Sequence, residues 1–316
     1  MEWLMAGVGL LILILAGDFL VKGAVNLSLR IGIPSMIVSL TVVAFGTSAP
    51  ELLISIRAVL DNLPGIALGN VVGSNTANVL MVLGVPALMA TMHTAECDSR
   101  KSFLIMIAAS LLFIGLAFTG VFTWWSGLIL LAGLLFMLTD AINDARLHRR
   151  EMKAAEAAEE EVEGADPDMP WWKIIFFLAV GLIGLPCGAQ ILVENAQVIA
   201  KAFGVSDTVI GLTLVALGTS LPELATTTMA ALRRQADVAL GNVIGSNIFN
   251  LLAIIGIASL VGPIPVDPEF LRMDLWVMLA CALLLFPFVF LKWNINRLWG
   301  IVFCALYGLY VVSIVT

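Results

Sequence analysis

Long apolar stretches separated by short polar breaks run through the whole chain. They fall roughly at residues 3–29, 35–60, 66–91, 102–119, 122–143, 171–200, 207–232, 238–262, 273–291 and 295–315. Each stretch can cross a hydrocarbon core of about 30 Å as a helix. Turn and charge signals mark the breaks, as at 30–34 and 233–237. The pattern predicts an all-α polytopic membrane protein with ten transmembrane helices.

The composition excludes a soluble protein. Apolar residues make up 60% of the 316 residues and charged residues 12%, whereas soluble domains contain about 45–50% and about 25%. The net charge of −7 is local, because eight of the 23 acidic residues lie between Glu151 and Asp168. The acidic balance therefore describes one polar segment, and it indicates neither a nucleic-acid partner nor a protein partner.

The chain contains a duplicated unit. Residues 38–84 align with residues 210–256 at a constant offset of 172, without a gap, and 23 of the 47 positions are identical. The repeat predicts a first five-helix unit at 1–143, an acidic linker at 144–170 and a second five-helix unit at 171–316. Because five is odd, the second unit must enter the membrane from the opposite side. Such inverted repeats are typical of secondary transporters, with the binding site near the midplane.

Lysine and arginine residues predict the orientation, because they concentrate on the cytoplasmic side of a membrane. If both termini lie outside, only Arg57, Lys201 and Arg272 face outward. The linker 144–170 is then cytoplasmic. The cytoplasmic side carries Arg30, Arg100, Lys101, Arg146, Arg149, Arg150, Lys153, Lys173, Arg233, Arg234, Lys292 and Arg297.

Glu51 and Glu223 occupy equivalent repeat positions inside apolar stretches. A charged side chain at the centre of a bilayer raises the free energy by about 3 kcal/mol. Two carboxylates at equivalent positions of inverted repeats should lie close together near the symmetry axis. Repulsion and desolvation disfavour two negative charges there unless a cation sits between them. The pair therefore predicts a cation site.

Prolines next to these acids predict backbone ligands. Pro50 has no N–H, so the carbonyl of Gly46 loses its helical partner, and Pro222 does the same to Gly218. Non-helical backbone at membrane depth is tolerated where it is buried or lines a cavity. Free carbonyls beside a carboxylate form the oxygen-rich surroundings that Ca²⁺ prefers.

A second polar cluster has helical spacing in both units. Asn70, Ser74 and Asn78 lie four residues apart and share one helix face, and Asn242, Ser246 and Asn250 repeat this spacing. We expect Ser74, Asn78, Ser246 and Asn250 to line the cation path. Interhelical hydrogen bonding is the alternative for this stripe, and we favour a packing role for Asn70 and Asn242.

The repeated motifs GTSAPE and GTSLPE, with GNVVGSN and GNVIGSN, carry a family resemblance. The chain resembles the cation/calcium antiporter superfamily, especially its sodium/calcium exchangers, in layout over essentially its whole length. The resemblance implies ten helices in two inverted repeats. It also implies that Glu51 and Glu223 bind Ca²⁺ and Na⁺ in alternation.

The resemblance implies further ligands at the matching positions. It assigns backbone and hydroxyl oxygens to Thr47 and Thr219, hydroxyls to Ser48 and Ser220, carbonyls to Ala44 and Ala216, and sodium sites to Ser74 and Ser246. Asn78 and Asn250 face the centre. Some members have Asp at the position of Asn250, where it is linked to K⁺ use, so Asn predicts independence from K⁺. No cofactor is expected beside the transported ions.

The sequence thus predicts a multi-pass cell-membrane antiporter that exchanges Ca²⁺ for Na⁺ by alternating access. Exchange of Ca²⁺ for H⁺ is the alternative, because paired glutamates can carry protons, and a passive Ca²⁺ channel is less favoured. An enzyme is not expected, because the only histidines, His93 and His148, fall in predicted cytoplasmic loops. The moving parts should be the first and sixth helices, which hold none of the named ligands.

Overall fold

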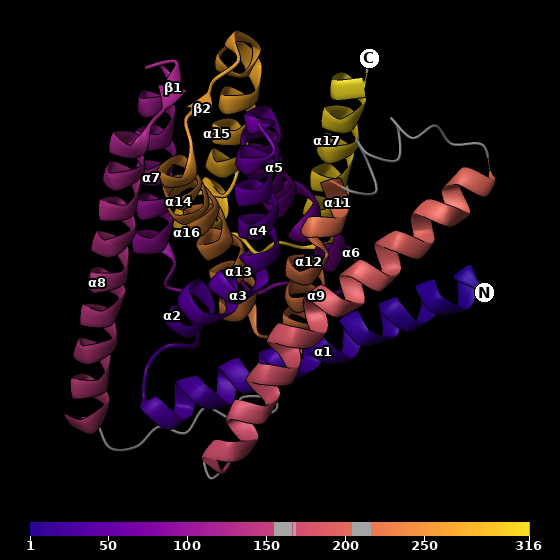
Figure 1. Cartoon of the computed structure of the whole chain (residues 1–316). Helices are drawn as coiled ribbons and strands as arrows, with labels where there is room; N and C mark the ends of the chain where they lie inside the picture. The colour runs from indigo at the N-terminus through magenta and orange to yellow at the C-terminus, as the bar shows by residue number, and fades with distance from the viewer. Residues whose placement is uncertain (155–165, 167–168, 204–215, 316) are drawn as a thin grey trace.

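The computed structural model describes residues 1–154, 166, 169–203 and 216–315. The described chain is mostly helical (Figure 1). The first half contains α1 (Glu2–Ile31), α2 (Ser35–Val38), η1 (Ser39–Val43), α3 (Ala44–Thr47), α4 (Ala49–Leu60), α5 (Pro64–Ala77), η2 (Asn78–Val82), α6 (Gly84–Met89), α7 (Arg100–Ala117) and α8 (Trp124–Ala154). The segments labelled η are single π-helical turns.

The second half is also almost entirely helical where it is described. It contains α9 (Trp171–Ala202), α11 (Ala216–Thr219), α12 (Leu221–Leu232), α13 (Ala236–Phe249), η4 (Asn250–Ile254), α14 (Ile255–Val261), η5 (Phe270–Asp274), α15 (Leu275–Leu283), α16 (Phe286–Phe290) and α17 (Arg297–Val315). The predicted stretch 207–232 begins among residues 204–215, which lie outside the described part, as does most of the linker 144–170.

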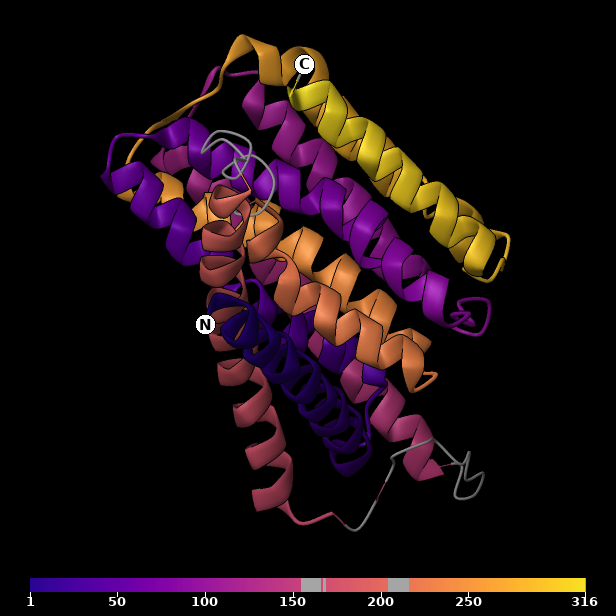
Figure 2. The ribbon, with the colours of Figure 1, turned by 90° about the vertical axis from the view of Figure 1, so that its right-hand side faces the viewer.

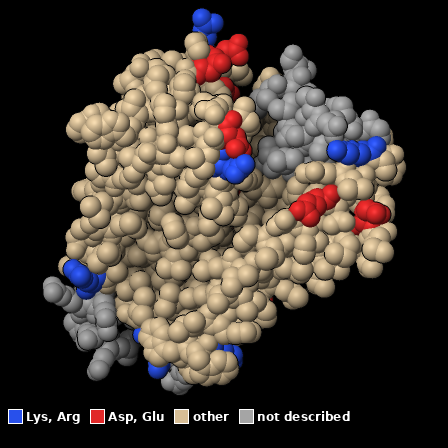
Figure 3. Space-filling view, in the orientation of Figure 1, with Lys and Arg blue, Asp and Glu red and all other residues tan. Residues whose placement is uncertain are grey.

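The described helices are those of a multi-pass membrane protein. Among these residues, seven helices are long and apolar enough to cross a membrane, and an eighth results if the bent pair Ser35–Thr47 and Ala49–Leu60 is one span. Most of the face drawn in Figure 3 carries no charged side chain. Ten spans remain a prediction, since the helix ending at Leu232 is described only from Ala216 and Arg297–Ser313 is shorter than the others.

Burial separates the helices into an inner and an outer set. The continuous helix of α13, η4 and α14 is 89% buried over its most apolar window, and that of α5, η2 and α6 is 78% buried. The corresponding windows of α8 and α9 are 28% buried, and exposed apolar side chains such as Leu135, Phe136 and Ile183 point outward from them. The inner helices carry the polar motifs, so the structure places these motifs away from lipid.

Helices α1 and α9 cross at close range at one edge of the bundle (Figures 1 and 2). Glycines permit this approach. A Cβ atom on Gly181 would lie 2.6 Å from Cβ of Leu20, and one on Gly188 would lie 2.9 Å from the backbone N of Leu13. The pair therefore packs backbone against backbone, as membrane helices do through small residues.

Two short loop contacts join the halves of the chain. The strands β1 (Val121–Phe122) and β2 (Ile264–Pro265) pair antiparallel, and Met92 pairs with Ile295 in an isolated bridge. The sequence predicts only helices and misses this small sheet, because two-residue strands have no readable periodicity. In each contact the two paired loops are placed on the same side of the membrane by the predicted topology, the outside for β1 and β2 and the cytoplasm for Met92 and Ile295.

We expect Gly181→Ala to lower the apparent melting temperature of the purified protein. The added methyl group must displace Leu20 or separate α1 from α9, and overpacking of this kind destabilises by about 1–3 kcal/mol. Thermal unfolding in detergent measures the effect. Gly115→Ala on α7 is the matched control, because its Cβ would meet no described atom within 4 Å. Equal melting temperatures for the two variants would contradict the close packing.

Candidate functional site

A break in each half of the chain delivers one glutamate to the interior. Helix α3 ends at Thr47 and α4 begins at Ala49, with a bend of 43° between the two parts. The residue at the break has nearly the same backbone angles in both halves: φ −85° and ψ 4° at Ser48, φ −86° and ψ 4° at Ser220. Glu51 and Glu223 thus lie in the first turns of α4 and α12.

Proline makes both breaks where the sequence predicts them. Pro50 and Pro222 lie at the second positions of α4 and α12, and neither can donate a backbone hydrogen bond to the preceding turn. The carbonyls of Ser48 and Ser220 accept the first bonds of the new helices, from Leu52 and Leu224. After each break a new helix therefore begins two residues before the acid.

Both carboxylates are buried in the interior. Glu51 and Glu223 are each 1% exposed, and they lie close enough to interact electrostatically. The hydroxyl of Ser48 donates to Oε1 of Glu223 over 3.2 Å, so the break in one half contacts the acid of the other. Both acids are thus buried, and Ser48, at the break before α4, reaches the acid of the other half.

Buried oxygens without partners collect at this site. Within the described residues, seven buried side-chain N or O atoms lack a hydrogen-bond partner. Six of them belong here, and all are oxygens: both Oε atoms of Glu51, Oε2 of Glu223, Oγ of Ser220, and Oδ1 of Asn78 and Asn250. Such a concentration is rare in proteins, where buried polar groups are almost always paired. These six oxygens belong to five residues that the sequence predicts as cation ligands.

Asparagine side chains brace the backbone of both glutamates. Nδ2 of Asn70 donates to the carbonyl of Glu51 over 3.1 Å and to Oγ of Ser55 over 3.0 Å. Nδ2 of Asn242 makes the equivalent bonds to Glu223 over 3.4 Å and Thr227 over 3.1 Å. This bracing agrees with the structural role favoured for Asn70 and Asn242, and it also fixes the first turn that carries each acid.

Hydroxyl groups line the space between α3 and α13. Oγ1 of Thr47 lies 3.3 Å from Oδ1 of Asn242 and 3.5 Å from Oγ of Ser246. The same hydroxyl and the N–H of Ser48 both donate to the carbonyl of Ala44. A cation that used the Ala44 carbonyl would therefore have to displace the Thr47 hydroxyl.

The remaining residues of the predicted site fall in the same region with less detail. Ser74 is buried on α5, one turn before Asn78, and Thr219 is half-buried at the end of α11. Ala216 is the first residue of α11, and its side chain lies outside the described part.

Sequence reasoning missed Asn75 and Asn247. Both are buried, and each contacts a predicted ligand from the other half of the chain: Asn78 donates to Asn247 and Asn250 donates to Asn75. Both are the last residue of the repeated GNVVGSN and GNVIGSN motifs, and both precede a predicted ligand by three positions. Residues three positions apart lie on the same side of a helix, so this spacing could have drawn attention to them.

This arrangement suits a hard cation. Carboxylate, amide and hydroxyl oxygens are the ligands of Ca²⁺, which takes 6–8 oxygens at about 2.3–2.6 Å. Two buried carboxylates without cationic partners are strongly unfavourable unless a positive charge enters between them. Within the described residues no group of three His, Cys, Asp or Glu side chains gathers to hold a metal. The candidate site thus depends on neutral oxygens beside two acids.

Comparisons with known proteins point to one family. The sequence model of the sodium/calcium exchanger protein family matches residues 1–141 and 173–316. The sodium/calcium exchanger MaX1 of Methanosarcina acetivorans is 34% identical over 96% of this chain and 95% of its own, and the inner membrane protein YrbG of Escherichia coli is 34% identical over 91% and 87%. A solved structure of the sodium-calcium exchanger NCX_Mj, soaked with Na⁺ and Sr²⁺, superposes with a TM-score of 0.82 at 31% identity, over 100% of this chain and 98% of that one.

We expect Ca²⁺ to raise the apparent melting temperature of the wild-type protein. A ligand that binds only the folded state stabilises it by about 2.7 kcal/mol at a concentration one hundredfold above Kd. In the double variant Glu51→Gln, Glu223→Gln, the shift should disappear. The same variant should melt higher than the wild type when both are free of cations, because two buried charges are gone. A Ca²⁺ shift that survives in the double variant would exclude these acids as the site.

Proposed function

Because the chain belongs to the sodium/calcium exchanger family, whose members are transporters, we propose that it is an antiporter that moves Ca²⁺ one way across the membrane and Na⁺ the other. One observation carries the proposal: among the described residues, six buried site oxygens lack a hydrogen-bond partner, three on the carboxylates of Glu51 and Glu223 and three on Ser220, Asn78 and Asn250. The similarity to MaX1 and NCX_Mj, both named as sodium/calcium exchangers, supports the same pair of ions.

The ligands that we propose come from equivalent positions in both halves. Glu51 and Glu223 carry the charge, and neutral oxygens complete the coordination. These neutral ligands are Thr47, Thr219, Ser48, Ser220, Ser74, Ser246, Asn78, Asn250, Ala44 and Ala216. Asn at 78 and 250 leaves two central carboxylates, which is why we propose transport without K⁺.

Charge balance couples the two ions. Two ionised glutamates carry a charge of −2, which one Ca²⁺ or several Na⁺ can neutralise. A closed and dry site with no cation would keep two unpaired buried charges, a state strongly disfavoured by desolvation. The site therefore changes its access from one side of the membrane to the other only when it holds cations. The protein then exchanges ions and does not let Ca²⁺ leak down its gradient. If more than two Na⁺ move for each Ca²⁺, transport also responds to the membrane potential.

We propose inverted repeats with both termini outside and the linker in the cytoplasm. The loop contacts support this topology: β1 pairs with β2 between two loops assigned to the outside, and Met92 pairs with Ile295 between two loops assigned to the cytoplasm. The backbone N–H of Asp166, in the linker, donates to Asn26 near the cytoplasmic end of α1 over 2.8 Å. The arginine and lysine distribution points the same way.

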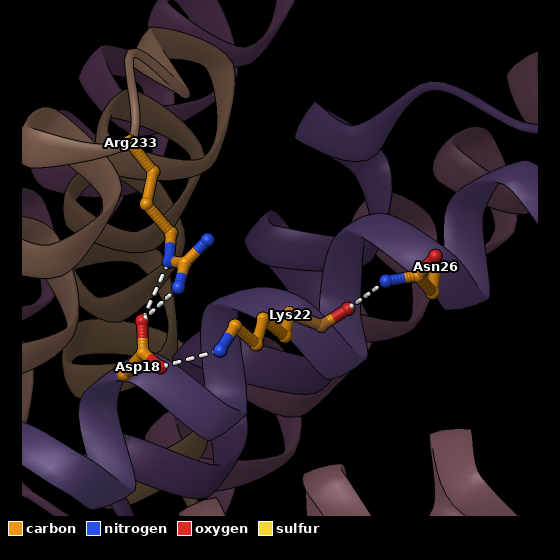
Figure 4. Close-up of polar contacts among 4 residues, drawn as sticks. All are labelled: Asp18, Lys22, Asn26 and Arg233. Atoms are coloured by element: carbon orange, nitrogen blue, oxygen red, sulfur yellow. Dashed lines mark hydrogen bonds and ion pairs between the residues drawn. The ribbon is translucent and has the colours of Figure 1, made fainter. Parts of the chain in front are cut away.

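Alternating access would move α1 and α9 past the inner helices, because neither holds a proposed ligand. An ion cluster ties α1 to the end of α12 (Figure 4). Asp18 accepts from Nε of Arg233 over 2.6 Å and pairs with Nζ of Lys22 over 2.9 Å. At the equivalent positions Gln190 and Asp61, the described contacts stay within one helix: Gln190 with Glu194, and Asp61 with Arg57. We propose that this asymmetry belongs to a state closed on the cytoplasmic side.

The proposed exchange predicts Ca²⁺ uptake into proteoliposomes that follows an outward Na⁺ gradient. Glu51→Gln and Glu223→Gln should each lower the initial rate at least one hundredfold, because each removes a charge that the cation must replace. Radioactive Ca²⁺ flux measures the rate, and Arg57→Gln, at an exposed pair away from the site, is the control. Full activity in either glutamine variant would refute the site.

The alternative couplings give different flux patterns. With pH clamped equal on both sides, uptake driven by Na⁺ supports the proposal, and uptake that requires a pH gradient supports exchange of Ca²⁺ for H⁺. Flux of Ca²⁺ without any counter-ion would indicate a channel. Uptake that requires K⁺ would contradict the role given to Asn78 and Asn250.

We expect Asp18→Asn to shift the protein toward the cytoplasm-facing state. The change removes the shared acid and leaves Lys22 and Arg233 without it. The KM for external Ca²⁺ should rise and the KM for internal Ca²⁺ should fall, by up to about tenfold, which corresponds to about 1.4 kcal/mol. Measuring both in oriented vesicles tests the direction. A change of the same sign on both sides would contradict the proposed closure.

A further inference from the structure

Four buried asparagines make a reciprocal contact between the two halves of the chain. Nδ2 of Asn78 donates to Oδ1 of Asn247 over 3.1 Å, and Nδ2 of Asn250 donates to Oδ1 of Asn75 over 3.0 Å. An offset of 172 converts Asn75 into Asn247 and Asn78 into Asn250. The two hydrogen bonds are therefore one contact made twice, in opposite directions.

The first pair has a fixed polarity. Nδ2 of Asn75 donates over 3.1 Å to the backbone carbonyl of Asn247, a group that can only accept. Asn75 must therefore direct its amide nitrogen at that carbonyl and its oxygen at Asn250. Because an amide oxygen cannot donate either, Asn250 must direct Nδ2 at Asn75. Its own oxygen is left on the other side.

The second pair reaches the same result through another acceptor. Nδ2 of Asn247 lies 3.7 Å from Sδ of Met106 on α7, and a thioether sulfur also accepts only. Oδ1 of Asn247 therefore accepts a hydrogen bond, and Nδ2 of Asn78 donates it. In both pairs an acceptor outside the site decides which end of the ligand amide faces the acids.

These two pairs of hydrogen bonds, here called the relay, leave the side-chain oxygens of Asn78 and Asn250 without a partner. Oδ1 of Asn78 and Oδ1 of Asn250 are buried and have no hydrogen-bond partner among the described residues. Each of these asparagines starts a π-helical turn, η2 or η4. Such turns are rare in proteins, and those that occur often lie at functional sites. Two neutral amides are thus held with their oxygens, not their NH₂ groups, available to a cation.

We propose that Asn75 and Asn247 are positioning residues that fix Asn250 and Asn78 as oxygen donors, and that they limit the charge of the site to that of its two glutamates. The inference rests on the proposed cation exchange. An ionised carboxylate at 78 or 250 would face the amide oxygen of Asn247 or Asn75, acceptor against acceptor at about 3 Å, whereas a protonated carboxyl could donate to that oxygen. The contact therefore favours an uncharged group at both positions, and the positive charge of the bound ions stays matched to Glu51 and Glu223.

The test uses Asn75→Leu and Asn247→Leu, which keep the side-chain shape and remove both amide groups. Loss of a residue that orients a metal ligand typically lowers affinity or activity by ten- to one hundredfold. The KM for Ca²⁺ in Na⁺-driven uptake should rise by that factor. Thr76→Val is the control, because Thr76 is buried beside Asn75 but its hydroxyl bonds to Val72 of its own helix. An unchanged KM in both leucine variants would overturn the proposal.

A second background separates positioning from simple packing. In Asn250→Leu the ligand itself is gone, so adding Asn75→Leu should not raise the KM further, although it does so in the wild type. Equal additional losses in both backgrounds would show that Asn75 acts independently of Asn250 and would overturn the proposal. Binding of Ca²⁺ alone, by calorimetry, should show the same non-additivity. If the wild type binds Ca²⁺ but shows no Na⁺-driven uptake, the proposed exchange fails while the relay is still tested by binding.

Discussion

Burial of two acids at equivalent positions of the two halves is the constraint on which the rest of this protein depends. Glu51 and Glu223 are almost fully buried, and three of their four carboxylate oxygens have no hydrogen-bond partner among the described residues. Such a pair is unfavourable in the absence of a cation. Dense packing of the inner helices, and asparagines that hold the backbone of each glutamate, offset the unfavourable free energy of the buried acids.

The same constraint explains how the helices divide their roles. The acids lie at the starts of α4 and α12, and the inner helices packed against them carry the bracing asparagines and the proposed oxygens of Ser74, Asn78, Ser246 and Asn250. The outer pair α1 and α9 packs most extensively against itself, and α1 also packs along α12, where Asp18 pairs with Arg233 at the end of that helix. One part of the chain therefore surrounds the two acids, and another part forms the outer helix pair.

Much of this architecture could be predicted from local patterns. The apolar stretches agree with the helices because a helix satisfies its own backbone in lipid and needs no distant partner. The breaks at Ser48 and Ser220 follow from the chemistry of Pro50 and Pro222 alone. The role of Asn75 could not be predicted, because its partners lie about 172 residues away and only tertiary packing brings them together. The β1–β2 pair escaped for a related reason, since its strands are too short to leave a periodic signal.

The reciprocal asparagine bonds also bear on how such a chain could arise and diverge. Neither half holds a correctly turned ligand by itself, because the residue that orients it belongs to the other half. A gene for one half would have produced a subunit that works only beside a second copy. After fusion, each copy could drift freely at its lipid-facing surface, while the two asparagines of each bonded pair could change only together.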